Sequence, residues 1–226
     1  MDVLHARALE GAPAGTAVVA AEQTGGRGSR GNSWVSPAGG LWLSVLLRPE
    51  RSSGLDLLSL RAGLAVSQAL SSMEPGVPIG IKWPNDLMLG DRKVGGILCE
   101  ARWQGDALCW VVVGLGLNVT NPVPEGLREA AGNLADRLPG RSAGDLAEPL
   151  AEVIRRIETG ASALAASEVE RFRALDWLRG RSVRAPAGGV ADGIAADGAL
   201  LLRLGDGRQV ALRAGPVELA DASLHT

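Results

Sequence analysis

Histidine is scarce in this sequence, and the two that are present, His5 and His225, lie far apart along the chain. Such a pair is a poor basis for a histidine metal site or a Ser-His-Asp triad. Cysteine is equally scarce. Cys99 and Cys109 are expected on adjacent strands beside a Gly105-Asp106 turn, where a disulfide is geometrically conceivable. Two cysteines make no disulfide framework, and a reducing compartment is the simpler assumption, so we interpret both as reduced core thiols.

The sequence also lacks a strong charge of either sign and a long apolar run. A net charge of -2 and a pI near 5.8 provide no field that would attract nucleic acid or an anionic membrane. No apolar run approaches the ~20 residues that span a bilayer, and the stretch from Met1 to His5 is not a secretory signal. We therefore expect a cytoplasmic protein with one substantial core, a small appended domain and no nucleic-acid or membrane partner.

Hydrophobic periodicity and turn residues predict an α+β fold, with helices packed on a mixed, mainly antiparallel sheet. Turn chemistry at Gly90-Asp91 and Gly105-Asp106 makes the neighbouring strands antiparallel. After Trp177, closely spaced turns predict a small barrel of roughly 45 residues, which divides the chain into domains 1–178 and 179–226. The expected strands are 16–21, 41–47, 79–83, 87–89, 93–102 and 107–119. The expected helices are 3–10, 55–73 and, within a mostly helical region 124–176, residues 147–157.

A glycine loop follows the first predicted strand. Residues Gly26 to Gly31 satisfy the G-x-G-x-x-G spacing of dinucleotide-binding proteins, but Pro37 breaks the helix that this motif requires. A nicotinamide-dependent oxidoreductase is therefore the weakest of the alternatives. Four glycines with Arg27 and Arg30 instead indicate a mobile, cationic strap that can approach a phosphate, and a merely solvated basic loop is the other interpretation.

Alternation along the predicted strands indicates a bare patch of sheet. Gly114, Gly116 and Asn118 share one face of their strand, which leaves room for a flat molecule or for a close helix crossing. The same alternation places Lys93 and Gly95 on one face. A further cluster, Lys82 to Asp86, presents polar groups around a proline at a strand end, and its alternative is an Asn-Asp turn with an incidental salt bridge to Lys82.

Four segments in this order resemble the motif set of the biotin protein ligases: Glu22–Gly28, the KWPND block Lys82–Asp86, Arg92–Leu98 and Gly114–Asn118. The resemblance covers about residues 3–120, and the C-terminal part is similar to the SH3-like domain of that family. It implies ligation of biotin to a lysine of a biotin carboxyl carrier domain through biotinyl-5'-AMP, with ATP and Mg²⁺. We expect a short form without the DNA-binding helix-turn-helix domain that some members carry, and a monomer or weak homodimer.

The resemblance also implies roles for individual residues. Lys93, Arg27 and Asp86 would form the catalytic set, with Lys93 neutralising the biotin carboxylate and then the α-phosphate. Asp86 would serve the magnesium ion or the incoming lysine, and Trp34 would stack near the adenine. The biotin contacts would be Gln23, Gly26, Arg27, Gly28, Ser29, Lys93, Gly95 and Gly96. The ATP contacts would be Arg27, Arg30, Trp34, Lys82, Asn85, Asp86, Lys93 and Asn118.

Two features depart from the family pattern. Ser29 stands where many members carry arginine, which predicts a weaker clamp on the adenylate and leakage of the intermediate. The family's strand and Ser-Thr motif before the first helix would end at Met1 and Asp2, so we expect the N-terminal strand to be missing. Two alternatives remain open: a lipoate or octanoate ligase or transferase of the same broad fold, which would lack the KWPND block, and a non-catalytic biotin or adenylate binder.

Overall fold

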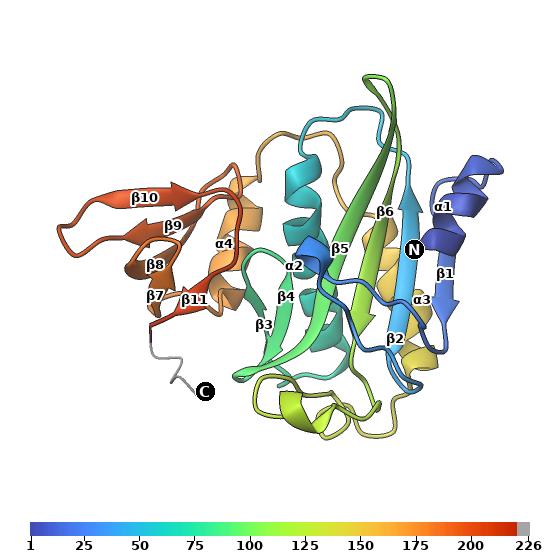
Figure 1. The fold of residues 1–226 in the computed structure, drawn as a ribbon, viewed down its shortest axis with the longest axis horizontal. Coiled ribbons are helices and arrows are strands. Elements are labelled where there is room, and N and C mark those ends of the chain that lie inside the picture. The colour runs from blue at the N-terminus through green and yellow to red at the C-terminus, as the bar shows by residue number, and fades with distance from the viewer. Residues whose placement is uncertain (221–226) are drawn as a thin grey trace.

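A computed structural model describes residues 1–220, and a six-stranded sheet forms its centre (Figure 1). The strand order is β1-β2-β6-β5-β4-β3, and every neighbouring pair is antiparallel. Parallel pairing within the described residues is confined to two isolated bridges, Ile81 with Asp176 and Lys93 with Ala131. The α+β fold class is thus confirmed. The strands are β1 (Ala17–Ala20), β2 (Leu41–Leu47), β3 (Ile79–Lys82), β4 (Asp86–Leu89), β5 (Arg92–Gln104) and β6 (Ala107–Leu117).

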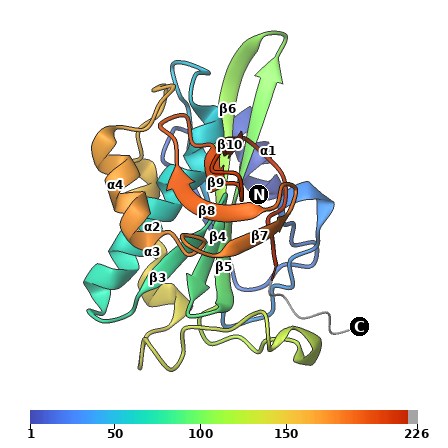
Figure 2. The ribbon, with the colours of Figure 1, turned by 90° about the vertical axis from the view of Figure 1, so that its left-hand side faces the viewer.

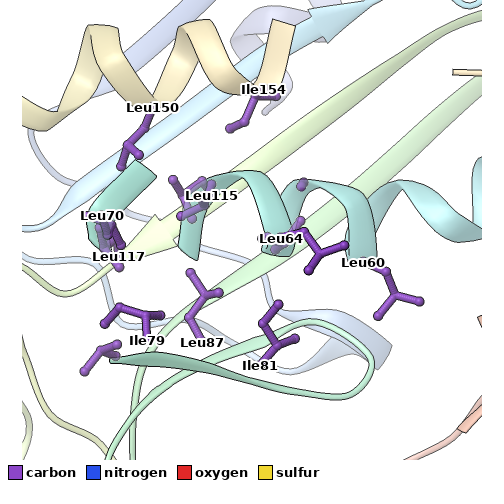
Figure 3. Close-up of a cluster of buried hydrophobic side chains, with 14 of the residues drawn as sticks. Leu60, Leu64, Leu70, Ile79, Ile81, Leu87, Leu115, Leu117, Leu150 and Ile154 are labelled. Carbon is purple, nitrogen blue, oxygen red and sulfur yellow. The ribbon is translucent and has the colours of Figure 1, made fainter. Parts of the chain in front are cut away.

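Helices cover one face of this sheet and form the main core with it. The long helix α2 (Leu58–Met73) follows a 3-10 turn, η2 (Leu55–Leu57), and packs on the sheet beside α3 (Ala143–Arg155), which contacts β2 directly. Figure 3 shows Leu64 of α2 close to Leu115 of β6, with Ile81 of β3 nearby. These side chains are almost fully buried, and burying a Leu or Ile side chain stabilises a fold by about 1.5–3 kcal/mol. The core therefore fixes the strands that carry the opposite, functional face.

Residues 124–176 are less helical than the sequence predicts. Their helices are the short η3 (Glu125–Leu127), α3 and α4 (Ala166–Leu175), and the remainder is turns and irregular chain. The backbone after η3 is instead tied to β5, because Lys93 N–H donates to the Ala130 carbonyl and Gly132 N–H donates to that of Lys93. Helix α3 also begins earlier than predicted, since Ser142 and Asp145 form a capping box at its start.

A second antiparallel sheet follows Trp177, in the order β10-β9-β8-β7-β11 (Figures 1 and 2). This confirms the change to short strands after Trp177. Within residues 1–220 no strand pairing joins β10 to β11, so no closed barrel is formed. The Trp83 indole N–H donates to the Gly198 carbonyl at 2.9 Å and ties this sheet to the first one. Its strands are β7 (Ser182–Ala185), β8 (Gly189–Ile194), β9 (Leu200–Arg203), β10 (Gln209–Leu212) and β11 (Glu218–Leu219).

The helix α1 (Asp2–Leu9) covers only the outer part of the other sheet face. Leu4 and Ala8 pack there on Leu46, Trp110 and Val112 in a small second core. The middle of this face is left to the chain between β1 and β2. In the described part of the chain no helix is long and apolar enough to cross a membrane.

Both cysteines are free, as predicted. Cys99 lies opposite Val113 in the β5–β6 register, so Cys109 is not its cross-strand neighbour. Burial raises the pKa of the Cys99 thiol to about 12, which keeps it protonated. The second histidine of the sequence, His225, lies outside the described residues.

Candidate active site

Glycines form the floor of the candidate site, in the middle of the sheet face that α1 leaves open. The β5–β6 register pairs Gly96 with Gly116 and Leu98 with Gly114. A Cβ atom at Gly116 would lie 3.0 Å from Nε1 of Trp34, and one at Gly114 would lie 2.8 Å from the Met1 sulfur. The predicted bare strip is therefore confirmed, and the flat group that approaches it is the Trp34 indole of this chain.

The glycine loop folds over this floor as an irregular hairpin, more closed than the strap expected from the sequence. Gln23 N–H donates to the Ser36 carbonyl at 3.0 Å, and Trp34 N–H donates to the Gly26 carbonyl at 2.9 Å. A Cβ at Gly26 would lie 2.3 Å from the Trp34 carbonyl oxygen, so this close approach requires glycine. The tip is a 3-10 turn, Ser29–Gly31, and no α-helix follows before α2. The rejection of a dinucleotide-binding motif is therefore supported.

The expectation that Lys93 and Gly95 share a strand face is wrong. A β-bulge shifts the β4–β5 register, so that Leu87 lies opposite Gly95 and Met88 lies opposite Lys93. The extra residue reverses the alternation. A Cβ at Gly95 would lie 3.0 Å from Leu117 in the core, whereas one at Gly96 would lie 3.7 Å from the Lys93 ammonium. Gly96 is therefore the glycine beside Lys93.

Lys93 joins the KWPND block to the glycine loop. Its Nζ lies 2.6 Å from Oδ1 of Asp86 and 4.9 Å from the centre of the Trp34 ring. Asn85 anchors the block, because its side-chain amide donates to the Ile97 carbonyl at 2.7 Å. Asp86 thus pairs with Lys93 and not with Lys82, and the incidental Lys82 bridge considered from the sequence is not what the structure shows.

Lys82 lies opposite Asp86 in the β3–β4 register but is not part of this ion pair. Its ammonium lies 5.5 Å from the centre of the Trp177 ring, against which the Arg181 guanidinium also stacks at 3.8 Å. Burial lowers the pKa of Lys82, and the nearby Asp86 carboxylate opposes this effect. Lys82 borders none of the three cavities described next.

Three cavities meet around the tip of the glycine loop. The first, of about 50 Å³, lies between the glycine floor and the loop, and Trp34 and Met1 fill much of it. The second, of about 460 Å³, lies beyond Trp34. The third, of about 330 Å³, is bordered by Arg30 and by Arg213 of the C-terminal part. Ser29 borders all three cavities. Trp34 and Lys93 border the first two, so they stand between a glycine-floored space and its larger neighbour.

The wall of the second cavity was not found from the sequence. It is largely apolar, with Val35 and Leu127 about half exposed. Asn118 borders it but points its amide into the protein, donating to the Gly132 carbonyl at 2.9 Å and accepting from Asn121 at 3.1 Å. Asn118 therefore holds the 118–134 segment in place. No hydrophobic period marks this segment, and only its Asn and Pro residues indicate a loop. The apolar side chains concerned are Val35, Val123, Pro124, Leu127, Ala130 and Ala131.

The structure brings most of the predicted site residues to the first cavity. The exceptions are Gly26, Gly95 and Lys82, which border none of the three cavities, Arg30 at the third and Asn118 at the second. Within residues 1–220 no cluster of three His, Cys, Asp or Glu side chains could hold a metal ion. The residues at the first cavity are Gln23, Arg27, Gly28, Ser29, Trp34, Asn85, Asp86, Lys93 and Gly96.

The known proteins that this chain resembles are protein ligases. The model of the biotin/lipoate A/B protein ligase family matches residues 3–118. A biotin–[acetyl-CoA-carboxylase] ligase of Paracoccus denitrificans is 34% identical over 92% of this chain and 94% of its own length. A biotin protein ligase from Aquifex aeolicus, solved in complex with biotin and ATP, superposes with a TM-score of 0.72 at 28% identity, over 92% of this chain and 90% of that one.

The fold is thus that of a class of protein ligases. This chain belongs to the biotin/lipoate A/B protein ligase family. A bifunctional ligase/repressor of Bacillus subtilis is 38% identical over 58% of this chain, but that match spans only 42% of the relative's length.

Proposed function

We propose that this chain joins biotin to a lysine of a biotin carboxyl carrier domain, with ATP as the energy source and biotinyl-5'-AMP as the intermediate. The observation that carries the proposal is that a glycine-floored cavity and a largely apolar cavity meet at Lys93, with Trp34 between them. A floor without side chains leaves room for the fused rings of biotin, and an adenine fits an apolar wall. The named relatives from Paracoccus denitrificans and Aquifex aeolicus are biotin ligases, which favours biotin over lipoate.

In the first step, the biotin carboxylate attacks the α-phosphorus of ATP and pyrophosphate leaves. This step needs close positioning and a cation near the phosphoryl oxygens, and Lys93 supplies that cation at the junction of the two cavities. In the second step, the neutral amine of the carrier lysine attacks the carbonyl of the mixed anhydride and AMP leaves. The hairpin of residues 23–36 covers the first cavity and so limits access of water to the anhydride.

Magnesium is part of the proposal, with Asp86 as its one candidate protein ligand. A single carboxylate beside the cavity fits an ion that Mg²⁺–ATP proteins hold largely through phosphates and water. When bound, magnesium would withdraw charge from the phosphoryl oxygens. Asp86 also holds the Lys93 ammonium, so it orients that cation whether or not it touches the ion.

The remaining assignments follow the geometry. We assign Gln23, Arg27, Gly28, Ser29 and Gly96 to the biotin side, because they border the first cavity. Trp34 and Lys93 serve both substrates. We assign the adenosine contacts to the apolar wall of the second cavity, which Asn118 supports, and not to Asn118 itself. Lys82 stacks on Trp177, and we assign it no contact with ATP.

The proposal also includes a domain division near residue 178. We also propose that the protein is cytoplasmic and acts as a monomer or weak homodimer.

The test is transfer of label to a purified biotin carboxyl carrier domain. The chain is incubated with ATP, Mg²⁺ and either biotin or lipoate, and the carrier is analysed by intact mass. We expect one biotinyl group on the carrier and none of the lipoyl product. Lipoyl transfer alone would move the chain to the lipoate ligases, and biotin binding without pyrophosphate release would make it a non-catalytic binder.

A further inference from the structure

We infer that His5 and Glu100 are positioning residues that set the direction of the Arg27 guanidinium at the edge of the first cavity, the proposed biotin site. The inference rests on the proposed function of that cavity. It concerns residues that come from α1 and β5, outside the four motifs that mark the family.

The chain of contacts begins at Trp110, whose indole N–H can only donate. This N–H lies 3.0 Å from Nδ1 of His5, so Nδ1 is the acceptor. The imidazole must then carry its proton on Nε2, which lies 2.9 Å from Oε2 of Glu100 and donates to it. His5 is 6% exposed and Trp110 is 8% exposed, so water does not compete freely for either bond. The imidazole is thereby fixed in one tautomer and one orientation.

Glu100, held by His5, in turn holds the Arg27 side chain. The Arg27 Nε–H donates to Oε1 of Glu100 at 3.2 Å, and Nη2 donates to Oε2 at 3.3 Å. Arg27 also forks onto Asp2, with donor–acceptor distances of 2.7 and 2.8 Å. The two carboxylates differ in exposure, because the side chain of Glu100 is 21% exposed and that of Asp2 is 76% exposed. Glu100, with His5 behind it, is the fixed partner, whereas Asp2 is open to exchange with a ligand anion.

Glu100 lies where it can hold Arg27 beside the first cavity. Gly96, Leu98 and Glu100 alternate along one face of β5, so Glu100 stands on the same face as the glycine floor, next to its end. Arg27 is on the loop above, where its backbone bridges to Ser33. Because Glu100 holds the Nε side of the Arg27 guanidinium, the two terminal nitrogens stay aligned for a carboxylate or phosphate. Less side-chain entropy of Arg27 is then lost when such an anion binds. Acidic partners also raise the pKa of Arg27, foremost through its hydrogen bond to Asp2.

Variants of the full chain test this arrangement. Glu100→Gln and His5→Leu break the chain of contacts at two points, whereas His5→Gln keeps one donor and one acceptor as the neutral imidazole does. Glu10→Gln is the matched control, since Glu10 lies at the end of α1 in an exposed pair with Arg7. We measure the biotin Kd by calorimetry, the KM and kcat of adenylate formation, and hydrogen–deuterium exchange of residues 23–34 without ligand.

We expect Glu100→Gln and His5→Leu to raise the biotin Kd and KM by about tenfold, as for a weakened charge-assisted hydrogen bond. The kcat should change less, His5→Gln should restore most of the affinity, and Glu10→Gln should match wild type. In an Arg27→Met background both effects should vanish, because the two residues act through Arg27. Equal losses with and without Arg27 would overturn the inference.

Hydrogen exchange decides the inference independently of ligand binding. Faster exchange of residues 23–34 in Glu100→Gln and His5→Leu supports it, and unchanged exchange contradicts it. Should the wild-type chain bind no biotin, the proposed function fails, while the exchange data still judge the positioning role.

Discussion

Replacement of Lys93 by methionine removes the cation at the junction of the two cavities and keeps a side chain of similar length. Lys93 lies 2.6 Å from Asp86 and is 33% exposed, so the effective dielectric constant around it is nearer to that of a protein surface than of a dry interior. Two unit charges about 4 Å apart interact by ~4 kcal/mol at an effective dielectric constant of about 20. Partial exposure reduces this value, and the loss of one group that stabilises transition-state charge typically costs about 10²–10³ in rate.

We therefore expect Lys93→Met to lower biotin-dependent pyrophosphate release by roughly 10²-fold or more under single-turnover conditions. Lys93→Arg keeps the charge but not its compact shape, so it should recover part of the rate. Thermal unfolding checks that both variants fold. A Lys93→Met rate within about fivefold of wild type would refute the reasoning, because a cation at that point would then carry little of the charge stabilisation.

Three further predictions concern other parts of the chain. Ser29 borders all three cavities, so Ser29→Arg should add a charge-assisted contact and slow adenylate release by about tenfold, measured by intermediate trapping; unchanged release contradicts the leakage hypothesis. Gly116→Ala places a methyl 3.0 Å from Trp34 and should weaken biotin binding by about tenfold in calorimetry, whereas Gly188→Ala, with no atom within 4 Å, serves as the control. Burial raises the pKa of Asp176 to about 6, so the folded protein holds the Asp176 proton more tightly than the unfolded chain does. The free energy of unfolding therefore falls as the pH rises from about 4 to 6. Asp176→Asn should therefore stabilise the protein by on the order of 2 kcal/mol at pH 7.5 and by little at pH 4, as measured by urea unfolding at both values.

The strands and the glycine floor could be predicted from the sequence because their signals are local. Seven consecutive buried residues define β2, and the predicted and observed bounds of Leu41–Leu47 coincide. Strict alternation places Gly114 and Gly116 on one face and the core residues between them on the other. The failed helix after the glycine loop is also a local property, since Pro37 is three residues past Trp34.

The remainder of the site depends on contacts that no local pattern encodes. A single extra residue in β5 moves Gly95 to the core side and Gly96 to the cavity, and such a bulge leaves no mark in the alternation. The apolar wall around Leu127 exists because the backbone of Ala130 pairs with Lys93, far from it in sequence. The Glu100 contacts join residues 95 and 73 positions apart, and α1 must first be placed on the sheet before they can be seen.

The most direct measurement of the central claim is a crystal structure of this chain after incubation with biotin, ATP and Mg²⁺. We expect the biotin ring system over Gly114 and Gly116, in the space that Trp34 and Met1 fill here and must leave. We expect the phosphate of the adenylate beside Lys93, and the adenine against the wall formed by Val35 and Leu127. A ligand bound away from the glycine floor, or an adenine outside that apolar wall, would contradict it.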